Sequence, residues 1–84
     1  GTLPTALIAG LGAAARIAGQ RMAEDHAHAL MLRDRLLARL SVPVTVNGSL
    51  DRRWPGNLNL SLPGIAVSLL KALPGLAISS GSAC

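Results

Sequence analysis

The chain has 84 residues and a net charge of +4; half of its residues are hydrophobic, yet only 1% are aromatic and one is cysteine. A chain this short buries only about 60–65% of the surface that its unfolded form exposes. A single cysteine excludes an internal disulfide, and two histidines with one cysteine do not make a structural zinc site. Small independent domains need aromatic bulk, disulfides or a metal, so we interpret the sequence as a segment of a larger protein.

The basic residues are scattered along the chain, and Trp54 is the only aromatic residue that could stack on a base. This distribution favours a solvated surface over a nucleic-acid interface. The apolar stretch Leu3–Ala15 has no basic residue before it, and Arg16 ends it well short of the ~18–20 residues that a spanning helix needs. We therefore expect neither nucleic-acid nor membrane binding, and we expect this stretch to be a helix that packs against a neighbour.

The first half of the chain predicts one long helix, from Pro4 to Leu40. Proline is tolerated in the first turn of a helix, and no second proline follows before Leu40. Apolar residues recur at helical spacing, and the helix would be roughly 55 Å long. Glycine weakens a helix by about 1 kcal/mol relative to alanine, so we expect a bend near the glycines Gly10, Gly12 and Gly19.

The second half predicts shorter elements separated by turns. Asn47-Gly48-Ser49 and Trp54-Pro55-Gly56 are turn signals, and prolines bound the next helix. The expected elements are a strand at Val42–Val46, a strand at Asn57–Leu62, a helix at Ile65–Leu73 and a strand at Leu76–Ser79. The fold class is therefore α/β, with a small α+β unit of strand-strand-helix-strand after the long helix.

Three groups of polar residues carry weak signals for chemistry. His26 and His28 are two positions apart, so they point away from each other on a helix and cannot easily share a metal ion. Lys71 is the only lysine and lies in an ordinary amphipathic helix position. Arg52-Arg53-Trp54 could clamp an anion, but a solvated turn with Trp54 folded over a core edge is the favoured interpretation.

Cys84 is the strongest candidate because of the residues before it. Ser79, Ser80, Gly81, Ser82 and Ala83 form a run of small residues directly after the last expected strand. Such a loop has no bulk to bury a thiol, and a lone exposed cysteine on it suits a nucleophile that must move. A free thiol without function remains the alternative from these residues alone.

The two ends and the middle of the chain resemble the group I cysteine desulfurases, which are pyridoxal-phosphate enzymes that supply sulfur for iron–sulfur clusters and tRNA thiolation. The resemblance begins at Gly1-Thr2-Leu3-Pro4 and continues through the Asn47-Gly48 turn. It then includes Pro55-Gly56-Asn57-Leu58-Asn59-Leu60-Ser61 and ends at Ser79-Ser80-Gly81-Ser82-Ala83-Cys84. It covers essentially the whole chain.

The resemblance implies roles for two residues. Cys84 matches the catalytic cysteine, whose thiolate takes sulfur from the substrate L-cysteine as a persulfide and leaves L-alanine. The small residues before it would let the thiol travel from the pocket to an acceptor protein. Thr2 matches a threonine that hydrogen-bonds the cofactor phosphate of the partner subunit, and a hydroxyl beside free helix amides is a sound anion ligand. A helix N-cap is an equally good interpretation of Thr2 from the residues alone.

The resemblance also implies the setting. Residues 1–40 would be the helix that links the large and small domains, and 41–84 part of the small domain of a cytoplasmic, homodimeric fold type I transferase. The family's Schiff-base lysine is not in this chain, because Lys71 lacks the Ser-x-His-Lys setting. We therefore expect the isolated chain neither to hold pyridoxal phosphate nor to turn over cysteine. Partners would be a second subunit and a sulfur-acceptor or scaffold protein. The alternatives are a selenocysteine-lyase-like or other class V aminotransferase relative, and a non-enzymatic α/β interaction module.

Overall fold

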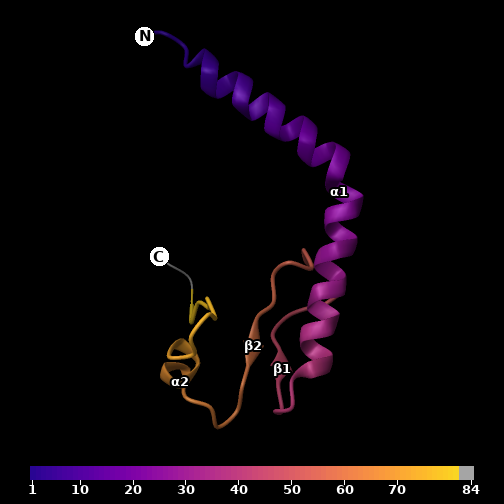
Figure 1. The fold of residues 1–84 in the computed structure, drawn as a ribbon, viewed down its shortest axis with the longest axis vertical. Coiled ribbons are helices and arrows are strands. Elements are labelled where there is room, and N and C mark those ends of the chain that lie inside the picture. Colours follow the sequence, from indigo (N-terminus) through magenta and orange to yellow (C-terminus); the bar gives the residue numbers. More distant parts are fainter. Residues whose placement is uncertain (82–84) are drawn as a thin grey trace.

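A single long helix, α1, runs from Thr5 to Arg39 in the computed structural model, which describes residues 1–81 (Figure 1). Its 35 residues correspond to about 52 Å of helix, and its ends lie one residue inside the predicted range. Pro4 occupies the N-cap position, and the amide of Ile8 donates to its carbonyl at 3.0 Å. At the other end Leu40 is already extended, and Pro43 disfavours a helical conformation in the residue before it.

Helix α1 changes direction near the middle of its length (Figure 1). Of the three glycines at which a bend was predicted, Gly19 lies nearest to this point. Side-chain positions at all three glycines face open space, since an added Cβ would meet no atom within 4 Å. None of these glycines is therefore in contact with a neighbouring segment that could press the helix into a bend.

Two short strands form the only sheet in the described part of the chain. β1, Thr45–Val46, pairs antiparallel with β2, Leu60–Ser61, and Thr45 lies opposite Ser61. The amide of Asn47 continues the pairing by donating to the carbonyl of Asn59 at 2.9 Å. Both strands lie inside the ranges predicted from the sequence but are shorter, because a two-stranded ladder has no further strand to extend against.

The last part of the described chain departs most from the prediction. Helix α2 spans Val67–Lys71, which is shorter than the predicted Ile65–Leu73. Gly64 and Gly75, with φ of +78° and +77°, form the turns on either side of it. The strand predicted at Leu76–Ser79 is wrong, since no strand is formed there. This segment runs beside α2 and away from β1 and β2, so its backbone has no ladder partner (Figure 1).

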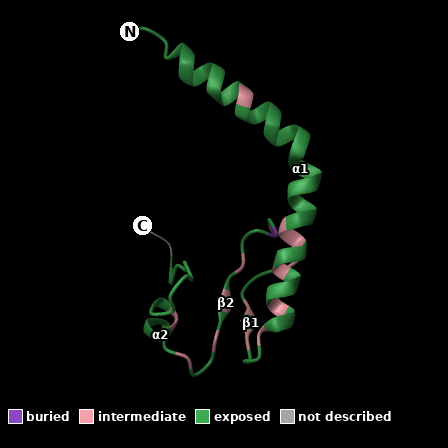
Figure 2. Cartoon of the chain, in the orientation of Figure 1, coloured by how far each residue is buried: buried purple, intermediate pink, exposed green. Residues whose placement is uncertain are grey.

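The architecture of residues 1–81 is a small α+β unit on a long helix, and this part of the chain has no hydrophobic core of its own. Among residues 1–81, Pro55 is the only one that is buried. Half-buried residues gather on the C-terminal half of α1 and on the strands that face it, whereas the N-terminal half is almost entirely exposed (Figure 2). The radius of gyration is 17.7 Å, against about 12 Å for a compact domain of this length.

Within the described residues, no helix joins the length and the apolar character that crossing a membrane would require, α1 included.

Candidate functional site

The described residues that lead to Cys84, from Leu76 to Gly81, are exposed, and two hydrogen bonds form between Ser79 and Gly81. The Ser79 hydroxyl donates to the carbonyl of Gly81 at 2.6 Å and accepts from the amide of the same residue at 3.4 Å. These two contacts close a turn over Ser79–Gly81. Cys84, the predicted nucleophile, follows three residues later and lies outside the described residues.

Thr2, the predicted phosphate ligand, is exposed and lies just before α1. The N-cap position belongs to Pro4, and no side chain among residues 1–81 makes a capping hydrogen bond to this helix start. The interpretation of Thr2 as the N-cap is therefore wrong, because the helix begins too late for its hydroxyl to serve. Thr2 lies three residues before the first helical residue, and its exposed hydroxyl could donate a hydrogen bond to a phosphate.

The structure does not bring Thr2 close to the cysteine loop. The N-terminus lies at the far end of the N-terminal half of α1, whereas the yellow segment that includes Ser79–Gly81 lies beside α2, well apart from it along the long axis of the molecule (Figure 1). Thr2 and the described part of the cysteine loop, Ser79–Gly81, therefore lie apart in this chain, whereas Cys84 itself is outside the described residues.

The weaker candidates take ordinary positions. Lys71 is exposed in the last turn of α2, as a surface lysine would be. His28 is exposed on α1, and no three metal-binding side chains gather within residues 1–81. Arg52–Trp54 lie in a turn, as predicted.

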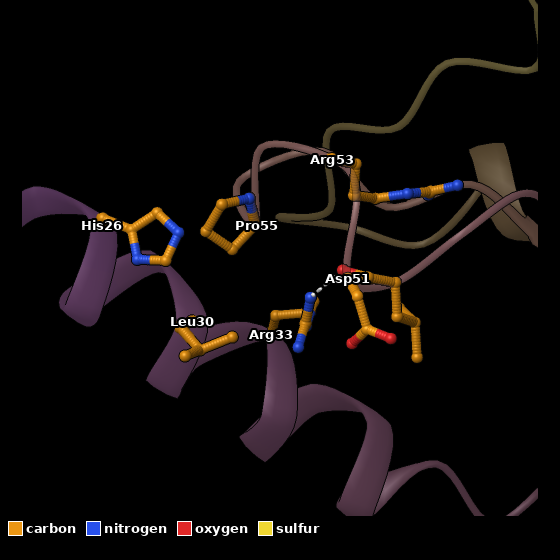
Figure 3. Close-up of a pocket in the computed structure, with 7 residues that line it drawn as sticks. His26, Leu30, Arg33, Asp51, Arg53 and Pro55 are labelled. Atoms are coloured by element: carbon orange, nitrogen blue, oxygen red, sulfur yellow. Dashed lines mark hydrogen bonds between the residues drawn. The ribbon is translucent and has the colours of Figure 1, made fainter.

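Two arginines hold the loop between the strands in place. Arg53 Nε donates to the Ser49 carbonyl at 2.6 Å, and its Nη2 donates to the carbonyl of Asn47. Arg33, whose side chain is 11% exposed, reaches across from α1 and donates to the Leu50 carbonyl at 3.0 Å, the dashed line in Figure 3. Both guanidinium groups thus donate to loop carbonyls, although Nη1 of Arg53 is buried without a hydrogen-bond partner among the described residues. This use speaks against an anion clamp at Arg53.

The same loop contacts α1 through its rings. Trp54 packs edge-on against His26, with ring centroids 5.7 Å apart, and Pro55 faces His26 (Figure 3). A hollow of about 210 Å³ lies beneath this contact, lined in part by Leu30 and Asp51. Trp54 is still 52% exposed, so it covers an edge of α1 rather than a core. The contact of Arg33 with Leu50 and the contacts of Trp54 and Pro55 with His26 therefore hold the loop against α1. We call these contacts the loop–helix joint, and their role is structural.

The sequence predicted the turn at Asn47-Gly48 but not the contacts that hold the loop against α1. Asn47-Gly48 predicted a tight turn, and Gly48 adopts φ of +83°. An added Cβ there would lie 2.5 Å from Arg53 Nη2, so glycine also makes room for the arginine. Nothing in the spacing of the sequence connects Arg33 to Leu50 or His26 to Trp54, because both contacts form only when the loop folds back on α1.

The comparison with curated proteins finds relatives that share one name, cysteine desulfurase IscS. The chain is 53% identical over 87 aligned positions to the cysteine desulfurase IscS of Vibrio cholerae, and the alignment covers all of this chain and 22% of that protein. The IscS proteins of Vibrio vulnificus and Colwellia psychrerythraea are 53% and 51% identical with the same coverage. The chain thus spans about a fifth of the length of these relatives. No family model and no solved structure matches it.

Proposed function

Since the chain belongs to the cysteine desulfurase family, we propose that it supplies the sulfur-accepting cysteine of an enzyme that removes sulfur from L-cysteine. The observation that carries the proposal is the match along the whole chain to proteins named cysteine desulfurase, together with a lone cysteine at the end of a small-residue loop. The shared name of these relatives favours this activity over that of a selenocysteine lyase or a binding module.

Cys84 acts as the nucleophile in this proposal. Its thiolate attacks the sulfur of the substrate cysteine, and the bond between that sulfur and the substrate β-carbon breaks. The electron pair stays with the carbon, which then takes a proton, so the products are L-alanine and a persulfide on Cys84. Pyridoxal phosphate supplies the electron sink for this bond cleavage. The run of Ser, Gly and Ala before Cys84 fits a thiol that afterwards meets an acceptor.

Thr2 serves as a ligand of the cofactor phosphate in this proposal. Its exposed hydroxyl precedes a helix start that no side chain among residues 1–81 caps, which is a favourable environment for an anion. The separation of Thr2 from Ser79–Gly81 supports an arrangement in which two subunits complete one site (Figure 1). Each subunit of a cytoplasmic homodimer would then lend its Thr2 to the site of the other.

The organisation follows the same proposal. Residues 1–40 form the helix that links a large domain to a small one, and 41–84 form part of the small domain of a fold type I pyridoxal-phosphate transferase. The exposed N-terminal half of α1 supports this, since Leu7 is 74% and Met22 66% exposed and such residues are normally covered. The acceptor of the persulfide is a scaffold or carrier protein for iron–sulfur assembly or tRNA thiolation.

Substitution of Cys84 tests the proposal in the full-length protein that contains this chain. We expect Cys84→Ala to abolish release of sulfide and alanine from L-cysteine while the absorbance of bound pyridoxal phosphate is unchanged. The matched control is Lys71→Ala, which removes the only lysine of the chain and leaves both unchanged. Retained turnover of L-cysteine in Cys84→Ala would contradict the proposal and favour a lyase-like relative.

A further inference from the structure

Asn47 and Gly48 form an asparagine–glycine pair directly after β1, and both residues are exposed. In such a pair the backbone nitrogen of the glycine can attack the side-chain carbonyl carbon of the asparagine, because no glycine side chain blocks the approach. The Gly48 amide donates to no backbone carbonyl within residues 1–81. This nitrogen is therefore available as a nucleophile, and water has access to the products of its attack.

The guanidinium of Arg53 contacts the peptide bond that joins Asn47 to Gly48. Its Nη2 donates to the carbonyl of Asn47. The Gly48 nitrogen must lose its proton before it attacks, and resonance of the peptide bond shares the resulting negative charge with this carbonyl oxygen. A positively charged donor on the oxygen stabilises that charge. Arg53 thus favours the attack.

Two residues across the strand pair hold the side chain of Asn47. Its Nδ2 donates to Asn59 Oδ1 at 2.9 Å and to Ser61 Oγ at 3.0 Å, and its Oδ1 accepts from Ser61 Oγ at 3.3 Å. The backbone amide of Asn47 is also fixed, since it donates to the Asn59 carbonyl at 2.9 Å. The attack requires the side-chain amide to turn its carbon toward the Gly48 nitrogen, so these side-chain hydrogen bonds must break first.

We propose that Asn47 is a site of spontaneous deamidation and that Asn59 and Ser61 slow the reaction by holding its side-chain amide. The Gly48 nitrogen gives its proton to hydroxide and bonds to the side-chain carbonyl carbon of Asn47. The bond from that carbon to Nδ2 breaks, and ammonia leaves with a proton from water. Water then opens the succinimide ring to an aspartate or an isoaspartate at position 47, and no oxidation or reduction occurs.

The product weakens the strand pair that holds the loop. A carboxylate at position 47 has no donor for Asn59 Oδ1 or for Ser61 Oγ, both of which accept from Nδ2 of Asn47. An isoaspartate also lengthens the backbone by one carbon where the amide of Asn47 pairs with the Asn59 carbonyl. The reaction therefore removes contacts between the segments that contain β1 and β2.

Peptide mass spectrometry of the full-length protein, incubated in mildly alkaline buffer, measures the deamidation of Asn47. We expect Ser61→Ala to speed it about fivefold, because a typical hydrogen bond no longer has to break. Asn59→Ala removes the other acceptor and should also speed the reaction, whereas Ser61→Thr keeps the hydroxyl and should keep the slow rate. Thr45→Val is the matched control, since Thr45 lies opposite Ser61 and makes no hydrogen bond to the Asn47 side chain.

In urea, which removes the strand pair, all of these proteins should deamidate at one common and faster rate. Equal rates for Ser61→Ala and Thr45→Val in the folded protein would overturn the proposal. Faster reaction in Ser61→Thr would also overturn it, as would the absence of deamidation at Asn47 from every protein. Equal melting temperatures exclude a general loss of folding as the cause of a faster reaction.

Discussion

Two arginine side chains hold the loop between the strands by hydrogen bonds to its backbone carbonyls. Arg33 donates from α1 to the carbonyl of Leu50, and Arg53 donates to the carbonyls of Asn47 and Ser49. Together they satisfy loop carbonyls that would otherwise bond water. A hydrogen bond to a charged donor contributes about 1.5–3 kcal/mol, so each arginine matters more than a surface ion pair such as Arg21 with Asp25.

Arg33 provides a prediction at this scale. Replacing it with alanine removes the hydrogen bond to Leu50, so the loop should leave α1 and Trp54 should lose its contact with His26. We expect the emission of Trp54, the only tryptophan of the 84-residue chain, to shift to longer wavelength as the indole becomes more hydrated. Arg35→Ala, an exposed arginine on the same helix, is the control. Identical emission from both variants would show that Arg33 does not hold the loop.

The helices, turns and strands show which sequence signals predict an element without knowledge of its neighbours in the fold. Helix α1 was predicted to within one residue at each end, because helical periodicity and a first-turn proline act locally. The turns at Gly48 and Gly64 likewise depend on residues within the turn. The strand expected at Leu76–Ser79 is absent, since a strand needs a partner and none lies beside this segment in the described chain.

Some features of the candidate site could likewise be predicted from local sequence, whereas others depend on how the chain folds. The small-residue run before Cys84 and the position of Thr2 could be read from the sequence, and the structure shows that Thr2 and the described part of the run, Ser79–Gly81, are exposed. The Ser79 turn could not have been predicted, because Ser79, Ser80 and Ser82 have the same side chain and only the backbone conformation selects among them. The joint of Arg33 and Trp54 likewise depends on the return of the loop to α1.

The whole molecule is extended and open, with dimensions of 54 × 30 × 25 Å. Large apolar side chains remain exposed along it, and Pro55 is the only buried residue among residues 1–81. Hydrophobic burial is the main favourable contribution to folding, so the chain alone has little to stabilise it beyond helix formation and the joint at Trp54.

The thermal unfolding of the isolated 84-residue chain tests this property. We expect a broad, weakly cooperative loss of helical circular dichroism, because there is no shared core to unfold as one unit. The full-length protein, in which the exposed face of α1 would be covered, is the comparison and should melt cooperatively. A sharp two-state transition of a monomeric 84-residue chain would contradict this expectation.

Cys84 is the residue that we propose receives the sulfur, and mass spectrometry of the full-length protein tests this role most directly. After one turnover with L-cysteine and without a reductant, we expect the peptide containing Cys84 to gain the mass of one sulfur atom and to lose it on treatment with dithiothreitol. Release of alanine with the added sulfur on another residue, or on none, would contradict the role of Cys84.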